Sequence, residues 1–319
     1  MSIKTILMTG GGGAGTIAAT KILKKSGKYR VILCDMDKWA AGLKFADKAY
    51  ILPAGDDERF IDVVKNIILK EHVDVFVPLV DEEILKSYEL KKEFPDLNIL
   101  LPEYDFSQMV LDKWWLIKNL KKFGMPCPKT YLASEPCEDL EYPIIMKPRI
   151  GRGSRNVMEI KSKEQVSAYK LLANLSEDRI LVQEKIKGKE FTISVVANKN
   201  GDVLAVVPKE VICKRGVTIT AVTRQNSTIQ NLCIEIQEKL KANGPFNVQL
   251  ILRNDNVPVV FEINPRYSTT IALTMAAGVN EIDILIENQH YSGELLLFEE
   301  NLLMARFYDQ LYFKQESIA

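Results

Sequence analysis

Hydrophobic and polar residues recur with two different periods along the first hundred residues. Short apolar runs, typical of buried strands, stand at residues 3–8, 31–34, 73–77 and 99–101. Between these runs, apolar residues recur at helical spacing over residues 14–25, 59–70 and 82–92. Strands that alternate with helices predict a parallel sheet with right-handed crossovers, so we expect an α/β domain here.

The pattern changes beyond residue 110. A predicted helix over residues 112–123 is ended by Gly124, and the prolines that follow cannot continue it. Strands are then predicted at residues 129–132, 144–147, 157–160, 180–184, 190–197 and 203–213, with a returning strand at 302–313. Helical spacing recurs at residues 163–173, 229–241 and 269–277. Strands and helices no longer alternate, which indicates a different architecture.

Residues 246–267 predict a β-hairpin. Two alternating runs flank Asn254-Asp255-Asn256, a spacer rich in turn-forming residues. With Asp255 and Asn256 at the centre of the turn, one face of the hairpin is entirely apolar. A slip by one residue would bury the polar face, so the register is well specified. The predicted pairs are Gln249 with Glu262, Val248 with Ile263, Leu250 with Phe261, and Leu252 with Val259.

The polar face of this hairpin is a candidate metal site. Gln249 lies opposite Glu262 in the predicted register, and Asn264 follows Glu262 on the same face. Because directly opposed residues have Cβ atoms about 5 Å apart, the three side chains can converge. Three oxygen-bearing side chains suit magnesium, which completes its shell with water and phosphate. The alternative is the solvated face of a half-buried sheet.

Composition narrows the class of protein. The 319 residues are long enough for two or three domains, and 42 basic residues balance 42 acidic ones. A neutral chain lacks the electrostatic attraction that nucleic-acid binding needs. The five cysteines have neither C-x-x-C nor zinc spacing, and no apolar stretch is long enough to span a bilayer. We expect a cytoplasmic protein that binds neither nucleic acid nor a membrane.

A glycine-rich turn follows the first strand. Gly10, Gly12 and Gly15 satisfy G-x-G-x-x-G, and Asp35 ends the next strand about twenty residues later, as a dinucleotide site requires. The turn is therefore compatible with a nicotinamide cofactor. Many α/β folds, however, use glycine at such a turn for geometry alone.

A second candidate phosphate site lies near residue 147. An apolar strand ends at Lys147, and the following loop, residues 149–155, contains two glycines and three arginines. A lysine at a strand end beside a glycine loop can contact phosphates. The alternative is a lysine that extends to solvent beside an ordinary loop.

These motifs, taken in order, resemble those of the ATP-grasp family. The run FEINPR at 261–266, the strand that ends at Lys147, and the run LVQEKIKGKEF at 181–191 carry the resemblance. It is strongest to one synthetase unit of the carbamoyl phosphate synthase large subunit. The resemblance implies a Rossmann-like pre-ATP-grasp domain at residues 1–110, followed by a two-subdomain α+β ATP-grasp fold. The small subdomain would span residues 111–188, and the large subdomain with the metal site residues 189–319.

The resemblance also implies a role for each site residue. Phosphate contacts fall to Lys113, Lys147, Gly153 and Ser154, although the loop keeps fewer glycines than the family pattern. Glu184, Lys185 and Ile186 would contact adenine, and Glu190 the ribose. Gln249, Glu262 and Asn264 would hold the metal, while Arg266 would contact the acceptor or the transferring phosphoryl group. We expect Arg266 and Lys147 to serve catalysis.

The implied activity is that of an ATP-dependent carboxylate–amine (or thiol) ligase with an acyl phosphate intermediate. Its cofactors would be ATP and Mg²⁺, with Mn²⁺ as an alternative ion, and its substrates a small carboxylate, such as an amino acid or a peptide, and an amine. Two alternatives stay open: an NAD(P)-dependent oxidoreductase that uses the glycine turn, and a non-catalytic ATP-binding protein. The sequence leaves open whether the chain forms a homodimer. Residues 213–216 could line the same cleft, and we expect Asp81 to cap a helix.

Overall fold

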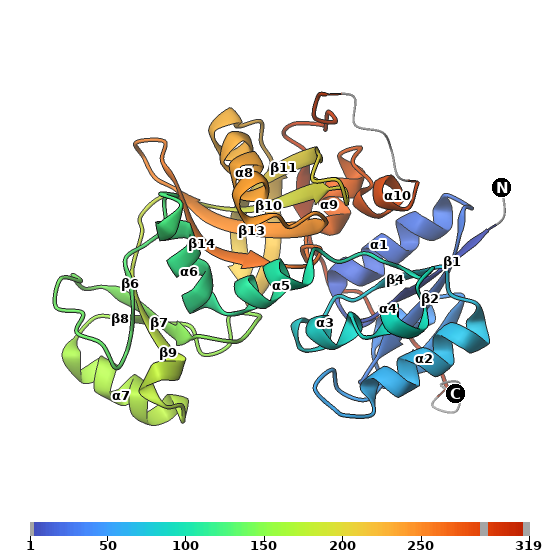
Figure 1. The fold of residues 1–319 in the computed structure, drawn as a ribbon, viewed down its shortest axis with the longest axis horizontal. Coiled ribbons are helices and arrows are strands. Elements are labelled where there is room, and N and C mark those ends of the chain that lie inside the picture. The colour runs from blue at the N-terminus through green and yellow to red at the C-terminus, as the bar shows by residue number, and fades with distance from the viewer. Residues whose placement is uncertain (1–2, 288–292, 315–319) are drawn as a thin grey trace.

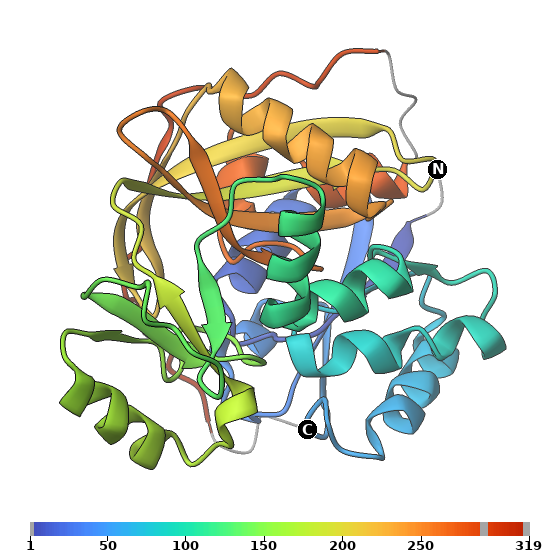
Figure 2. The ribbon, with the colours of Figure 1, turned by 60° about the vertical axis from the view of Figure 1, so that its left-hand side comes forward.

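The computed structural model describes residues 3–287 and 293–314, which form three sheets with helices packed around them (Figure 1). A parallel sheet lies at one end of the molecule, and two antiparallel sheets form the rest (Figures 1 and 2). The α/β fold class predicted from the sequence is confirmed. None of the helices in the described residues has the length and apolarity needed to cross a bilayer.

The N-terminal sheet has five parallel strands in the order β3-β2-β1-β4-β5. Its strands are β1 (Lys4–Met8), β2 (Tyr29–Asp35), β3 (Lys48–Ile51), β4 (Val75–Val77) and β5 (Asn98–Ile99). Its helices are α1 (Ala14–Lys25), α2 (Phe60–Glu71), α3 (Asp81–Ser87) and α4 (Leu90–Glu93), with the short 3-10 helix η1 (Ala41–Lys44). The helix predicted at 82–92 is two helices, and β3 was not predicted. The parallel order places the ends of β1, β2 and β4 at one edge.

The second sheet is antiparallel, with the order β6-β9-β7-β8. Its strands are β6 (Thr130–Leu132), β7 (Ile144–Pro148), β8 (Met158–Ile160) and β9 (Ile180–Glu184). The helices of this region are α5 (Tyr104–Leu111), α6 (Lys113–Lys122) and α7 (Lys163–Ala173), and the 3-10 helix η2 (Glu177–Arg179) precedes β9. Helix α5 was not predicted, and helix α7 has the predicted bounds.

The third sheet has six antiparallel strands in the order β14-β13-β10-β11-β12-β15. Its strands are β10 (Lys189–Ala197), β11 (Val203–Arg215), β12 (Val217–Thr223), β13 (Pro245–Leu252), β14 (Pro258–Asn264) and β15 (Leu303–Ala305). Helices α8 (Ser227–Leu240), α9 (Ile271–Ala276) and α10 (Glu281–Ile286) belong to the same stretch of chain. Strand β12 was not predicted, and the predicted strand at 302–313 is limited to β15.

The hairpin of β13 and β14 has the predicted register only at the end away from its turn. Gln249 lies opposite Glu262, as predicted, but the register shifts by one at the next residue, so that Leu250 lies opposite Val260. Phe261 is the extra residue of a β-bulge, which periodicity alone cannot reveal. The side chains of Phe261 and Glu262 therefore both line the same cavity, although they are neighbours in sequence. The predicted pairs Leu250–Phe261 and Leu252–Val259 are wrong.

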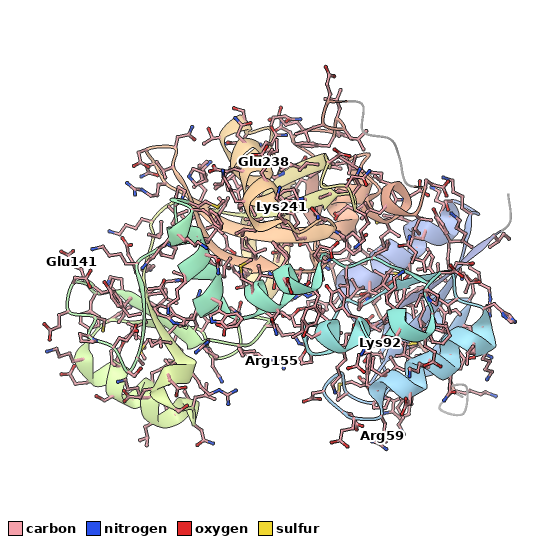
Figure 3. The ribbon with its side chains drawn as sticks, in the orientation of Figure 1. Arg59, Lys92, Glu141, Arg155, Glu238 and Lys241 are labelled. Atoms are coloured by element: carbon pink, nitrogen blue, oxygen red, sulfur yellow. The ribbon has the colours of Figure 1, made fainter. Side chains whose placement is uncertain are left out.

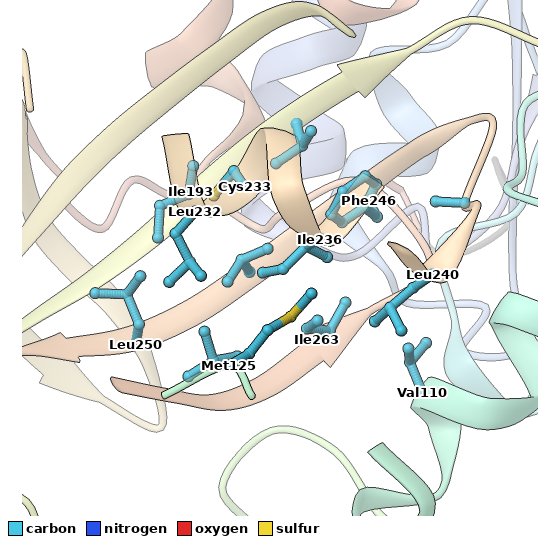
Figure 4. Packing of buried hydrophobic residues seen from close by; sticks show 14 of the residues in the cluster. Val110, Met125, Ile193, Leu232, Cys233, Ile236, Leu240, Phe246, Leu250 and Ile263 are labelled. Carbon is cyan, nitrogen blue, oxygen red and sulfur yellow. The ribbon is translucent and has the colours of Figure 1, made fainter. Parts of the chain in front are cut away.

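A large apolar core holds this hairpin in place. Helix α8 is amphipathic, and Leu232, Ile236 and Leu240 point from it toward β13 and β14 (Figure 4). Buried residues of α5 and α6 belong to the same cluster. Burial of apolar area is the main stabilising contribution to such a core, at about 25 cal/mol per Å². The polar face of β13 and β14 is thus positioned by a rigid apolar face.

Gly15 lies where the N-terminal domain meets the third sheet's helices. Helix α1 packs against α9, and a Cβ atom at Gly15 would lie 2.6 Å from the carbonyl oxygen of Thr269. We predict that Gly15→Ala destabilises the protein by roughly 1–3 kcal/mol, because backbone atoms on both sides must move. Thermal unfolding tests this prediction. A glycine-to-alanine change inside a helix otherwise stabilises, so a raised melting temperature would contradict the close contact.

Candidate functional site

A cavity of about 380 Å³ lies between the second and third sheets. Both sheets, the loop after β7 and the start of α6 contribute to its walls. The cavity brings together all twelve residues to which the family resemblance assigned a role. They are Lys113, Lys147, Gly153, Ser154, Glu184, Lys185, Ile186, Glu190, Gln249, Glu262, Asn264 and Arg266. Their individual roles stay predictions, but they line one space although the sequence separates them by up to 153 residues, from Lys113 to Arg266.

The hairpin end of the cavity carries the candidate metal ligands. Gln249 and Glu262 are directly opposed, and Asn264 follows on the same face. The side chains of Gln249 and Asn264 make no hydrogen bond within the described part of the chain, and Glu262 forms one ion pair there, with Lys113 at 3.9 Å. Within residues 3–287 and 293–314 there is no group of three His, Cys, Asp or Glu residues that could hold a metal. An ion here would have one carboxylate and two amides.

Lys147 is buried at the floor of the cavity. Its ammonium group donates to Gln183 Oε1 at 2.9 Å and to the carbonyl of Phe261 at 3.4 Å, a carbonyl in the bulge of β14. The ring of Phe261 lies 5.6 Å from the same nitrogen. Burial lowers the pKa of Lys147 to about 8, and the nearby Glu262 carboxylate only partly offsets this. Lys147 therefore points inward, and the alternative of a solvent-exposed lysine is wrong.

Lys113 lies at the first turn of α6, where the helix dipole disfavours a cation. Its ammonium group donates to the carbonyl of Gly151 at 2.5 Å and lies 3.9 Å from Glu262. Asp112 caps the helix by accepting from the N–H groups of the next turn, and it also binds Arg149 at 2.7 Å. The carboxylate of Asp112 thus fixes both the helix and the loop beside Lys113.

The loop after β7 extends from the second sheet toward the N-terminal domain. Gly153 and Ser154 have φ values of +64° and +57°, in the left-handed region, so the backbone makes a tight turn here. Arg152 donates to Glu82 of α3 at 2.7 Å, and the hydroxyl of Ser154 donates to Gly216 at 3.4 Å. Arg155 lines the cavity and, within the described residues, pairs with no carboxylate; Figure 3 shows it between the second sheet and the N-terminal domain. The loop adds positive charge to this wall.

The opposite end of the cavity has mixed character. Glu184, Lys185 and Ile186 follow one another at the end of β9, and the carboxylate of Glu184 accepts from the backbone N–H of Lys129 at 3.1 Å. Glu190 at the start of β10 binds Lys214 at 2.7 Å. Apolar side chains and backbone beside a carboxylate suit a planar ring next to a sugar.

Arg266 joins the cavity to the N-terminal domain. It directly follows the candidate metal ligands and forms an ion pair with Asp81 at the start of α3. Burial acts to lower the pKa of Arg266, but the carboxylates of Asp81, Glu262 and Glu82 outweigh it and raise the pKa above its ordinary value. The predicted helix-capping role of Asp81 is wrong, because Val80 occupies the cap position and Asp81 is the first helical residue.

Two further residues of the cavity, Gln183 and Asn247, were given no role from the sequence, and a third, Lys214, was expected there only as part of the segment 213–216. Gln183 holds Lys147, and its amide also donates to Thr130 at 2.8 Å. Asn247 lies opposite Asn264 in the hairpin, and the register predicted from the sequence already implied this pair. Lys214 pairs with Glu190, and Lys214 and Gly216 line the cavity, so the expectation that residues 213–216 could line this cleft is confirmed for these two. Only the pairing of Asn247 had a signal in the sequence.

The chain matches two protein-family models and has sequence similarity to known enzymes. A model of the ATP-grasp domain matches residues 110–270, just over half of the chain, and a model of the PylC-like N-terminal domain matches residues 6–101. Over 263 residues the chain is 27% identical to the carbamoyl phosphate synthase large chain of Pyrococcus furiosus, which covers 72% of this chain and 24% of that protein. Over 159 residues it is 30% identical to D-alanine–D-alanine ligase of Clostridium perfringens, covering 46% and 52% respectively.

The fold has solved neighbours at low sequence identity. The crystal structure of the L-amino acid ligase from Bacillus licheniformis aligns with a TM-score of 0.69 at 17% identity, covering 90% of this chain and 74% of that one. At this identity the likeness concerns the fold alone. The chain spans only about a quarter of the length of the Pyrococcus synthase and about half that of the Clostridium ligase.

Proposed function

This chain belongs to the ATP-grasp family, and from that membership we propose that it is an ATP-dependent carboxylate–amine ligase. A carboxylate oxygen of the acceptor attacks the γ-phosphorus of ATP, which gives an acyl phosphate and releases ADP. The nitrogen of an amine then attacks the acyl carbon, and inorganic phosphate leaves. We also propose the domain division expected from the sequence: a first domain that ends at residue 110, and two ATP-grasp subdomains that meet at residue 188.

The observation that carries the proposal is the distribution of charge in the 380 Å³ cavity. Lys113, Lys147 and Arg266 all lie near Glu262, so the hairpin end combines three cations with the one carboxylate among the candidate metal ligands. Phosphoryl transfer needs positioning and charge neutralisation more than it needs a protein nucleophile. The two lysines would offset phosphate charge, and the end near Glu184 and Glu190 would receive the adenosine.

The side chains at the hairpin end fit magnesium. Glu262 supplies the negative charge, and Gln249 and Asn264 supply amide oxygens that form no other hydrogen bond within the described residues. When bound, magnesium would neutralise and orient the phosphates. One carboxylate is a weak ligand set by itself, so we expect the ion to be held together with the nucleotide.

Arg266 would bind the acceptor beside the transferring phosphoryl group. Its side chain is largely covered, with 13% exposed, and Asp81 fixes its position. A planar fork of N–H donors suits a carboxylate or a phosphoryl group. Amino acids or peptides are the acceptors that the names of the Clostridium and Bacillus relatives favour, and small amines are the expected nucleophiles.

The nicotinamide alternative is less well supported. Asp35, which would bind the ribose of a dinucleotide, already accepts from the backbone N–H of Gly12 at 2.7 Å. Gly15, the third glycine of the turn, lies against Thr269 of the adjoining domain. Gly10 has a φ of +60°, so Gly10 and Gly15 both have a structural reason that needs no dinucleotide.

A binding measurement and a turnover screen test the function together. We expect ATP with magnesium or manganese to bind the wild-type chain more tightly than NADH, as measured by calorimetry. We expect phosphate release only when a carboxylate acceptor and an amine are both present. Tighter binding of NADH would overturn the proposal, and ATP binding without phosphate release for any acceptor would favour a non-catalytic protein. A cytoplasmic location and a homodimer remain predictions.

A further inference from the structure

A second cavity of about 360 Å³ adjoins the first on the side of the N-terminal domain. Its walls include the glycine turn, the end of β2 and the segment after β14. Arg266, Ser268 and Thr269 line both cavities, so the two spaces meet at the residue proposed to bind the acceptor. If the nucleotide occupies the first cavity, the second is large enough for an amino-acid-sized acceptor.

Three arginines line this second cavity, and their partners differ. Arg152 binds Glu82, and Arg266 binds Asp81. Arg306, which directly follows β15, forms no ion pair with any carboxylate in the described ranges 3–287 and 293–314. Its guanidinium donates to the carbonyl of Thr218 at 2.8 Å and to that of Thr269 at 2.5 Å.

Those two bonds leave Arg306 incompletely satisfied. A guanidinium has five N–H groups, and the remaining three have no acceptor among the described residues. Arg306 is only partly exposed, and burial without a nearby carboxylate lowers its pKa. A partly desolvated cation without a counter-charge is unfavourable, and an anion in the cavity would relieve the cost.

The positions of Arg306 and Arg266 suit the binding of two different groups of a ligand. Arg266 is open to both cavities, whereas Arg306 lines the second cavity alone. The guanidinium of Arg306 donates to the carbonyls of Thr218 and Thr269, and these two residues line the first cavity. They therefore separate Arg306 from the first cavity. An anion held by Arg306 would therefore lie away from the transferring phosphoryl group.

We propose that the acceptor carries a second anionic group, besides the carboxylate that is activated, and that Arg306 binds it. The proposal rests on the ligase function proposed above. It assigns the acceptor to small molecules with two anionic groups, the second of which is either a carboxylate or a phosphate. The competing role of Arg306 is to fix β15 against β12 through the two carbonyls.

Matched pairs of acceptors test the proposal. The pairs are L-glutamate with L-glutamine, L-aspartate with L-asparagine, and O-phospho-L-serine with L-serine, each with ATP, magnesium and hydroxylamine as the nucleophile. We expect kcat/KM for phosphate release to be at least about 10-fold higher for the acidic member of one pair, because a charge-assisted bond forms. The pair that shows the preference identifies carboxylate or phosphate.

The Arg306→Gln variant separates binding from structure. We expect KM for the acidic acceptor to rise about 10- to 100-fold, with kcat, KM for ATP and the kinetics of the neutral acceptor kept within about 3-fold. Arg253→Gln, at the exposed hairpin turn, is the control and should match the wild type. If Arg306 only fixes β15, acidic and neutral acceptors will lose activity together, which overturns the proposal.

Two other results would also overturn it. A wild-type enzyme that turns over none of the acidic acceptors, or that prefers none of them, lacks the proposed specificity. The binding of ATP with magnesium to the protein is measured first, by calorimetry and without any acceptor. Failure of ATP to bind would overturn the ligase function itself, whereas normal ATP binding without an acidic preference would overturn only the role of Arg306.

Discussion

Replacing Glu262 with glutamine should lower kcat/KM for ATP turnover roughly 1,000-fold or more. Glu262 is the one carboxylate among the candidate ligands, so the variant leaves magnesium with only amide oxygens from the protein. Electrostatic stabilisation of transferring charge commonly contributes an effect of this size. Phosphate release, measured with any acceptor that the wild type accepts, checks the result. Alanine at this position should have the same effect.

The fold should survive the Glu262 change. Glutamine has the same shape as glutamate, and the ion pair that Glu262 forms with the buried Lys113 is long at 3.9 Å, so its loss should alter stability by less than about 1 kcal/mol. Glu238→Gln, an exposed residue of α8 labelled in Figure 3, is the matched control and should keep full activity. A folded Glu262→Gln protein with wild-type turnover at ordinary magnesium concentrations would refute the metal assignment.

Lys147→Met should weaken ATP binding about 100-fold and lower turnover at least as much. Methionine keeps the length of the side chain but removes the buried ammonium that would face the phosphates. Since a buried charge is costly without an ion in the cavity, we expect the empty protein to remain folded. Calorimetry with ATP and magnesium measures the affinity. Lys161→Met, an exposed residue after β8, should bind ATP like the wild type.

The same lysine predicts how ATP binding depends on pH. Without nucleotide the pKa of Lys147 is lowered to about 8, and phosphates would favour the charged form and raise it. ATP binding above pH 8 should therefore take up a proton, and Kd should rise with pH by up to about tenfold per unit. Lys147→Met should show no such dependence. Equal pH dependence in both proteins would mean that another group titrates.

The sequence predicted the local features of the candidate site well. Alternation placed Gln249 opposite Glu262, and the apolar run before Lys147 predicted the strand that ends there. Such predictions succeed where one buried face fixes the register, because a slip would bury polar residues. The strands β9 and β10 were predicted from their apolar residues, whereas the adenosine contacts at their ends were implied by the family resemblance.

Long-range pairings and local irregularities could not be predicted in this way. The bulge at Phe261 inserts one residue without changing the apolar pattern, so the register near the turn was wrong. The ion pair of Arg266 with Asp81 joins residues 185 positions apart, and no periodicity relates them. Lys214 lies in a hairpin whose second strand, β12, is partly exposed and so lacks a clear apolar signal.

Helix α3 also limits how the N-terminal domain of this protein can be exchanged for that of a relative. Two consecutive residues at its start, Asp81 and Glu82, each hold an arginine from the other part of the chain: Arg266 beside the candidate metal ligands, and Arg152 in the loop after β7. An N-terminal domain borrowed from a relative would have to present the same two carboxylates at the same place. Chimeras joined near residue 110 should therefore be unstable unless the first domain presents these two carboxylates to Arg266 and Arg152.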